Sequence, residues 1–320
     1  MTAAMARPGP HFQPLLGQVA ILLSTHNGAA YLPEQLDSLS RQSHQDWVLY
    51  WRDDRSSDAT RLIMKDFLVL LGPGRSVVID DGEWIGSTAS FLRLLGAAHA
   101  GGAAWVAFAD QDDIWLPNKL ARGLRALATA PQRSPALYCA RQVLVDAALR
   151  RMGESPKVRH PGGFPAALAQ NIATGCTLML NAAAAGLVAS SRPPAGTVHD
   201  WWCYLLVAAA GGQVLADPEP VVLYRQHESN LIGAPASASR RAAVALRRGP
   251  GAFMAKLRAH VAALADQPHL MAAPARRELA VIAHSLARGP VARLKALRLP
   301  GLRRQTITET LLFRLWFLAG

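Results

Sequence analysis

Short apolar runs alternate with longer segments of helical spacing over the first 110 residues. The runs read as strands buried on both faces, and they are VAILLST (19–25), WVLYWRD (47–53), SVVID (76–80) and AWVAFAD (104–110). Apolar positions between them predict helices over residues 31–42, 56–71 and 88–100. Strands and helices alternating at this pitch predict a parallel sheet covered by helices on both faces.

The pattern is less regular from residue 138 to residue 224, where we expect further strands and helices to complete the same domain. APASAS (234–239) reads as a linker of small residues. Helical segments rich in Arg, Ala and Leu follow it, interrupted by Gly-Pro pairs and prolines. The sequence therefore predicts an α/β domain over residues 15–235 and a basic helical extension over residues 236–320.

The net charge of +12 belongs to the extension, because residues 236–320 hold 15 Lys and Arg against three Asp and Glu. With 51% hydrophobic residues the chain of 320 residues can bury a core. Its three cysteines show no CxxC spacing, which excludes a disulfide framework and favours a cytoplasmic setting. The N-terminus lacks a signal-peptide pattern, and the uncharged segment 162–191 carries too many polar residues for a membrane helix.

Three carboxylates crowd the segment FADQDDIWLPNKL (108–120), directly after a predicted strand. In an extended segment Asp110 and Asp112 would point the same way, and they would repel each other without a cation between them. Such oxygen ligands suit Mg²⁺ or Mn²⁺, particularly when phosphate oxygens complete the shell. The cluster therefore predicts a divalent ion that neutralises a diphosphate. Alternatively, Asp113 begins a helix near Pro117 and the other two carboxylates are merely solvated.

Ligands of open parallel sheets bind beyond the carboxyl ends of the strands. Polar residues gather at these ends, and we expect them to converge on one edge: Ser24, Thr25, Asn27, Asp53, Asp54, Asp110, Gln111, Asp112 and Asp113. For Asp53 and Asp54 a role in a turn is the alternative.

The chain resembles a known family over residues 18–233. The resemblance rests on VAILLSTHNGAAYLPEQLDSLSRQSHQDWVLYWRDDRSSDAT, FADQDDIWLPNKL, HDWW (199–202) and YRQHESNLIG (224–233). These motifs are similar to those of family 2 inverting glycosyltransferases with the GT-A fold, in particular the bacterial rhamnosyltransferase-like branch. The resemblance implies a Rossmann-like α/β domain with a mixed, mostly parallel sheet. It also implies transfer of rhamnose or a related hexose from a nucleotide diphosphate to a hydroxyl by direct displacement.

The resemblance assigns roles at the motif positions. Asp200 would be the general base, and Asp112 would ligate Mn²⁺ or Mg²⁺ together with Asp110 and His227. The implied donor-binding residues are Ser24, Thr25, Asn27, Glu34, Asp53, Asp54, Asp110, Gln111, Asp113 and Arg225. An N-cap role for Asp200 and a structural role for His227 are the alternatives. His199 would orient the base or pack, and Cys176 reads as a small buried residue.

Two positions depart from the branch. Arg55 stands where Gly usually follows the paired Asp of the second strand, and Ile85 stands where an Asn usually precedes the glycine. Both departures leave the identity of the donor open.

The basic extension suggests that the protein binds a membrane surface. An amphipathic cationic helix binds anionic membrane surfaces, which would fit an acceptor on a lipid and a peripheral location on the inner face of the membrane. Alternatively, the apolar C-terminal stretch packs on the α/β domain or on a second subunit. No nucleic-acid recognition motif accompanies the charge.

The expected substrates are a dTDP- or UDP-sugar and a glycan or lipid-linked acceptor of cell-surface polysaccharide synthesis. A metal-dependent nucleotidyltransferase of a sugar phosphate is the second hypothesis, although STHNGAAYLPEQ lacks a Gly- and Arg-rich phosphate loop. An inactive nucleotide-binding scaffold is the third, and intact Asp112 and Asp200 argue against it.

Overall fold

The computed structural model describes residues 17–79, 81–160, 162–227 and 238–320, the last range without the side chains of residues 238–248. Most of the N-terminal segment, the predicted domain boundary at residue 235 and residues 228–233 of the last motif lie outside the described residues.

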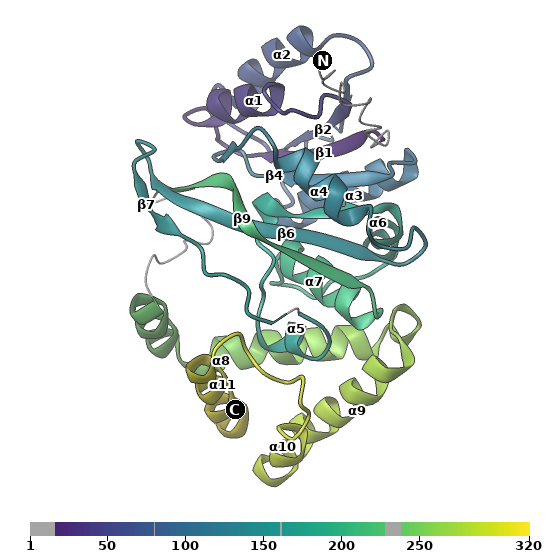
Figure 1. The fold of residues 1–320 in the computed structure, drawn as a ribbon, viewed down its shortest axis with the longest axis vertical. Helices are drawn as coiled ribbons and strands as arrows, with labels where there is room; N and C mark the ends of the chain where they lie inside the picture. Colours follow the sequence, from purple (N-terminus) through teal and green to yellow (C-terminus); the bar gives the residue numbers. More distant parts are fainter. Residues whose placement is uncertain (1–16, 80, 161, 228–237) are drawn as a thin grey trace, which may run out of the picture.

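A sheet of nine strands forms the centre of the molecule (Figure 1). The strands are β1 (Val19–Thr25), β2 (Trp47–Asp53), β3 (Ser76–Val78), β4 (Trp105–Ala109), β5 (Ile114–Trp115), β6 (Ala136–Asp146), β7 (Arg151–Glu154), β8 (Met179–Asn181) and β9 (Gln213–Gln226). Their order is β3-β2-β1-β4-β8-β6-β9-β5, with β7 paired to β6. The first four strands are parallel, as the sequence pattern predicts, and β8 joins β4 in the antiparallel direction.

Helices cover both faces of the sheet and continue into the extension. They are α1 (Leu32–Ser40), α2 (Thr60–Leu71), α3 (Ser87–Ala100), α4 (Lys119–Leu127), α5 (Ala166–Ala169), α6 (Ala182–Ala189), α7 (His199–Ala209), α8 (Ala238–Ala265), α9 (Ala273–Arg288), α10 (Pro290–Ala296) and α11 (Ile307–Ala319). Two 3₁₀ turns, η1 (Gly175–Thr177) and η2 (Pro268–Leu270), lie between them.

Alternation along β1 explains why its sequence is apolar throughout. Val19, Ile21 and Leu23 enter the core beneath α1, α2 and α4, whereas Ala20 and Leu22 enter the core that α3, α6 and α7 share. Successive side chains of a strand point to opposite faces, so a central strand with both faces covered must be apolar at every position.

The pairing of β5 with β9 brings two distant motifs together. Ile114 lies opposite Leu223 in this antiparallel pair. The residues just before β5 therefore meet the end of β9, 112 positions later in the chain, as the Asp113–Arg225 contact below shows.

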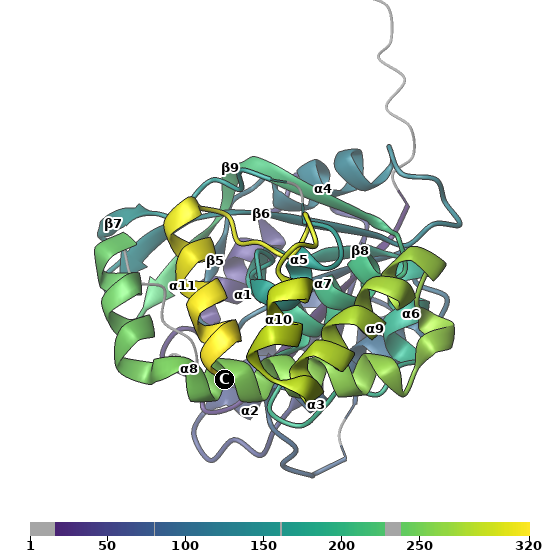
Figure 2. The same cartoon turned by 90° about the horizontal axis from the view of Figure 1, so that it is seen from below.

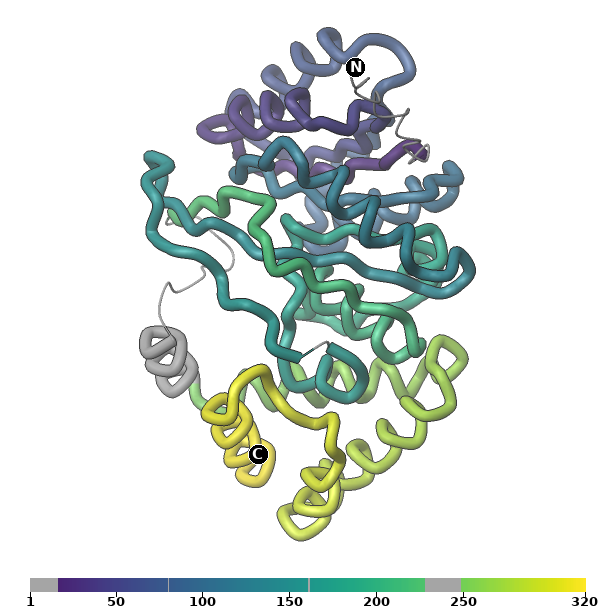
Figure 3. The backbone as a smooth tube through the Cα atoms, viewed as in Figure 1, coloured from purple at the N-terminus to yellow at the C-terminus, as the bar shows by residue number. Residues whose placement is uncertain are grey.

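The extension shares the core of the α/β domain. Leu257 and Val261 of α8 and Phe313 and Phe317 of α11 belong to the same buried cluster as α7. Figure 3 shows the segment after β7 running from the sheet down to α5, beside the extension. In the described part of the chain, no helix combines the length and the apolar character needed to cross a membrane.

We predict that Phe313→Ala destabilises the whole chain by about 3–4 kcal/mol, because it opens a cavity in a core common to both parts. Phe313 is fully buried and packs against Phe253 of α8 and Phe317. Urea unfolding followed by circular dichroism measures the change. Leu315→Ala on the exposed side of α11 is the control, expected within about 0.5 kcal/mol of the parent. A separate early transition with an unchanged main transition would contradict a shared core.

Candidate functional site

The carboxyl ends of β1 and β2 are tied together through Asp53. Its carboxylate accepts hydrogen bonds from Thr25 Oγ1 at 3.0 Å, Ser56 Oγ at 2.6 Å and the Ser56 amide at 2.9 Å. Trp51 Nε1 donates to Thr25 Oγ1 at 3.0 Å. Asn27 has a left-handed backbone (φ 47°), and its Oδ1 accepts from the Ser57 amide at 2.8 Å. Thr25, Asn27 and Asp53 thus hold the loops after β1 and β2 together.

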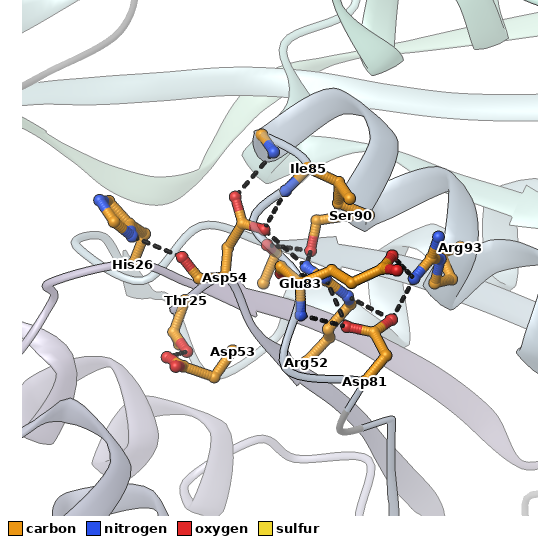
Figure 4. A network of polar contacts seen from close by, with 12 residues as sticks. Thr25, His26, Arg52, Asp53, Asp54, Asp81, Glu83, Ile85, Ser90 and Arg93 are labelled. Atoms are coloured by element: carbon orange, nitrogen blue, oxygen red, sulfur yellow. Dashed lines mark hydrogen bonds and ion pairs between the residues drawn. The ribbon is translucent and has the colours of Figure 1, made fainter. Parts of the chain in front are cut away.

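Asp54 anchors the loop that precedes α3 (Figure 4). Its carboxylate accepts the amides of Ile85 and Gly86, each at 2.8 Å, and pairs with Arg52 at 2.7 Å. Because Ile85 contributes its backbone N–H, the departure from Asn leaves this contact intact.

The same network reaches Ser24 and the acidic residues before α3. Arg52 forms a second ion pair, with Asp81 at 2.7 Å, and Arg93 pairs with the same carboxylate. Ser24 Oγ donates to Ser90 Oγ at 2.7 Å. These contacts fix the start of α3 against the end of β1.

Arg55, the other departure, has φ 60° in the left-handed region. That conformation is the one glycine adopts without steric cost, which accounts for the branch's usual residue at this position.

Gln111 holds the loop after β1. Its Oε1 accepts the His26 amide at 2.8 Å and its Nε2 donates to the His26 carbonyl at 2.9 Å. A side chain at Gly28 would lie 2.3 Å from Gln111 Oε1, so the close approach requires glycine. The carboxylate turn after β4 is therefore fastened to the turn after β1.

Residues 111 and 112 form a turn rather than an extended segment, so the strand alternation expected for Asp110 and Asp112 does not apply. Asp112 faces His227, whose Nε2 lies 2.9 Å from Asp112 Oδ2. Asp113 and Asp110 instead share a cluster with Cys176, in which the ligand atoms lie within 4.8 Å of one another. Asp112 remains near enough for its charge to raise the pKa of Asp110.

Arg225 is fully engaged with the protein around it. Its amide donates to Asp113 Oδ1 at 3.1 Å and its Nε to the Asp112 carbonyl at 2.9 Å. The guanidinium also donates to the Ala147 carbonyl at 2.7 Å and forms an ion pair with Glu34. Arg225 thus fixes the Asp113 carboxylate and the backbone of Asp112, and Glu34 holds Arg225 in place.

Lys119 is a site residue that the sequence analysis missed. It is completely buried, donates to the Phe108 carbonyl at 3.2 Å and lies 3.0 Å from the Trp115 ring centroid. Burial lowers the pKa of Lys119, and burial raises the pKa values of Asp113 and Cys176. A thiol held protonated is a poor ligand for Mg²⁺ or Mn²⁺, so the Cys176 side of the cluster is structural.

Asp200 is the second residue of α7 and not its N-cap. Its carboxylate accepts the Gly175 amide at 3.0 Å, Asn171 Nδ2 at 3.1 Å and the Trp201 amide. Burial raises the pKa of Asp200 to about 6, against the effect of these three donors. Gly175 adjoins Cys176, so one turn connects the Asp200 carboxylate to the cluster at the end of β4.

Asp110 is close enough to this carboxylate and to Asp112 to feel the charge of both. Burial raises the pKa of Asp110 to about 7, and the charges of Asp112 and Asp200 add to the effect. The structure therefore brings the sequence-predicted base and the sequence-predicted metal ligands into one site.

His199 packs into the interior beside the base. Its ring stacks on Phe108 at 5.3 Å and lies 4.2 Å from Phe91, and burial lowers its pKa to about 3. A side chain at Gly175 would lie 2.7 Å from His199 Nε2. A neutral His199 therefore sets the position of the turn that binds Asp200.

The extension adds a cation to the site, which the sequence analysis did not assign to it. Lys256 Nζ of α8 lies 5.5 Å from the Trp201 ring centroid, and its charge lowers the pKa of Asp200. Trp201 Nε1 is fixed on the Ala167 carbonyl at 2.8 Å. The sequence does not reveal the role of Lys256, because no motif includes it and Trp201 lies 55 residues away in another helix.

The side chains at the outer end of this site are of the kinds that bind divalent cations. Asp110, Asp112 and His227 would supply carboxylate and imidazole ligands, a set that suits Mn²⁺ as well as Mg²⁺. Asp112 and His227 already face each other from the ends of two paired strands.

Comparisons with known proteins agree with this geometry. The family model described as Glycosyl transferase family 2 matches residues 20–148. A dTDP-rhamnosyl transferase, RfbG of Shigella flexneri, is 26% identical over 66% of this chain and 74% of its own length. The Escherichia coli glucosyltransferase WfgD, which acts on α-D-GlcNAc-diphosphoundecaprenol, is 31% identical over 32% of this chain and 38% of its own length.

The fold is also that of a solved structure. The crystal structure of S. aureus TarS residues 1–349 with UDP-GlcNAc superposes with a TM-score of 0.59 at 12% identity, covering 84% of this chain and 72% of that one. This likeness confirms the expected GT-A architecture.

We predict that Asp54→Asn lowers the free energy of unfolding by about 3 kcal/mol, because it leaves buried Arg52 and two amides poorly matched. Asp37→Asn, which removes an exposed ion pair with Arg41, is the control and should cost about 0.5 kcal/mol or less. Urea denaturation compares the two variants. Equal small losses would show that Asp54 is free to serve a ligand instead.

Proposed function

We propose that this chain, which belongs to glycosyl transferase family 2 and acts on nucleotide sugars, transfers a hexose to a hydroxyl with inversion and uses Asp200 as the general base. The observation that carries the proposal is the place of the Asp200 carboxylate. It accepts the amide of Gly175, and the next residue in that turn, Cys176, lies in one cluster with the carboxylates of Asp110 and Asp113 after β4. A donor diphosphate beyond β4 and an acceptor beside Asp200 would therefore meet in one site.

Asp200 has the properties of a base that works near neutral pH. Its pKa of about 6 leaves it ionised at pH 7 yet basic enough to accept a proton from a hydroxyl in the transition state. In the displacement, the acceptor oxygen attacks the anomeric carbon, its proton passes to Asp200, and the bond to the diphosphate breaks. The Gly175 amide and Asn171 hold the carboxylate in one orientation throughout.

The donor side follows from the carboxyl ends of the strands. Asp110, Asp112 and His227 would hold a divalent cation, which when bound neutralises charge on the leaving diphosphate. Thr25, Asn27 and Asp53 would form the pocket for the nucleotide base. Ser24, Asp54, Gln111, Glu34 and Arg225 would hold these loops and the start of α3 in place through their contacts with the protein.

The relatives suggest which substrates to test first. The Shigella flexneri relative favours a dTDP-rhamnose donor, and the Escherichia coli relative favours a lipid-diphosphate acceptor. A thermal-shift panel of dTDP-, UDP- and GDP-sugars, each with and without Mn²⁺, tests the donor. Stabilisation by one nucleotide class that depends on the metal supports the proposal, and equal stabilisation by nucleoside triphosphates favours a nucleotidyltransferase.

We predict that Asp200→Asn lowers kcat by about 10²–10⁴-fold while metal-dependent donor binding persists, because only the proton acceptor is removed. Isothermal titration with the donor and a transfer assay separate the two effects. Asp112→Ala is the comparison variant, and it should weaken donor binding as well as transfer. Near-normal turnover by Asp200→Asn would refute the assignment of the base.

We predict a pH dependence set by Asp200 and tuned by Lys256. The base must be ionised, so kcat at saturating donor and metal should fall as pH drops below about 6. Lys256→Gln removes a charge that lowers the pKa of Asp200, so this limb should move to higher pH, whereas Lys256→Arg should keep it. A uniform loss at every pH in Lys256→Gln would indicate a packing role alone.

A further inference from the structure

Helix α11 has two apolar faces, and only one of them is covered. Phe313 and Phe317 are fully buried against α8. On the opposite side Ile307, Leu311 and Leu315 are 81%, 55% and 64% exposed. Their spacing of four residues places them in one stripe along the helix. The sequence analysis offered two hypotheses for the C-terminal stretch, packing on the α/β domain and contact with a partner. One face of α11 packs on the protein, and the other is open to a partner.

Helix α10 enlarges the apolar surface. Its Val291 and Leu294 are 74% and 52% exposed, and the side chain of Arg293 donates to the Leu318 carbonyl at 3.0 Å, which fixes α10 against α11. Figure 2 shows the two helices next to each other on the side of the molecule opposite the N-terminal strands. We call the surface formed by Val291, Leu294, Ile307, Leu311 and Leu315 the docking face.

The charges around the docking face have one sign. Lys295, Arg298, Arg303 and Arg314, which lie on α10, on α11 or on the segment that joins them, are exposed, whereas Glu309, the only acidic residue in 290–320, is half-buried. Exposed apolar side chains that are rimmed by cations match a bilayer surface with anionic headgroups, because each basic group near such a surface contributes about 1 kcal/mol.

The charge pattern argues against a second copy as the occupant. A two-fold interface places the same patch against itself. Four exposed cations would then face four others with no exposed carboxylate from these helices to offset them, and such like-charge contacts are unfavourable. We propose that the docking face binds the surface of an anionic lipid bilayer with α10 and α11 lying along it.

The docking face is connected to the site by a short chain of contacts. Arg304 Nε donates to the Ala169 carbonyl at 2.9 Å, and the Gln305 amide donates to Gln170 Oε1 at 2.8 Å. The next residue, Asn171, donates to Asp200. Residues just before α11 thus support the turn that holds the base, so a membrane-bound enzyme would keep Asp200 close to the bilayer. Membrane binding itself does not depend on the proposed reaction.

Sedimentation of the full chain with vesicles tests the proposal. The protein should bind vesicles of phosphatidylcholine mixed with phosphatidylglycerol, and binding should weaken with added salt and in vesicles of phosphatidylcholine alone. The double variant Leu311→Ser/Leu315→Ser should bind about tenfold or more weakly, since two leucines no longer bury apolar area. Both positions are exposed, so the thermal unfolding temperature should remain that of the parent.

Leu70→Ser on α2 is the matched control. Leu70 is 83% exposed, but it lies on a helix of the α/β domain away from the docking face, so vesicle binding should be unchanged. Absence of binding to anionic vesicles, or an equal loss in the Leu70 variant, would overturn the proposal. A dimer in light scattering that the double variant abolishes would overturn it too, because the face would then join two copies.

Discussion

Repulsion among buried carboxylates is the constraint around which this site is built. Burial raises the pKa values of Asp110 and Asp113, the charge of Asp112 raises both further, and Asp200 adds to the effect on Asp110. The carboxyl ends of the parallel strands do not by themselves supply groups that offset these effects. The groups that stabilise the ionised carboxylates come from four later elements of the chain: Lys119 in α4, the Gly175 amide in η1, the Arg225 amide in β9 and Lys256 in α8.

The helical extension contributes to the balance of charge at this site. Its helices share a core with α7, and one of them carries Lys256 to the ring of Trp201, the residue after Asp200. The division into a domain and an extension therefore describes the sequence better than the packing. Removal of the extension would expose the core surface under α7 and withdraw positive charge from Asp200 at the same time.

The fold was largely predictable from periodicity, but the site was predictable only in part. β1 and β2 have the predicted bounds because apolar runs between turn residues leave few alternatives. The motif positions around Asp112, Asp200 and His227 do converge. The support given by Arg225 to Asp112, or by Glu34 to Arg225 across 191 residues, has no local signature. The turn at residues 111 and 112 likewise could not be predicted, and the expected directions of Asp110 and Asp112 assumed an extended chain there.

The pKa of Asp200, the proposed base, depends on two opposed effects: burial raises it, and nearby donors and charge lower it. Burial alone would raise the pKa of Asp200 further, and the carboxyl group would then more often hold its proton when an acceptor arrives. An exposed carboxylate would have a pKa near 4 and would accept a proton less readily, each unit of pKa being worth about 1.4 kcal/mol. Three hydrogen-bond donors and the charge of Lys256 limit the rise to about 6. The neutral ring of His199 holds the Gly175 turn without adding charge, so the balance is set by elements that the reaction itself does not alter.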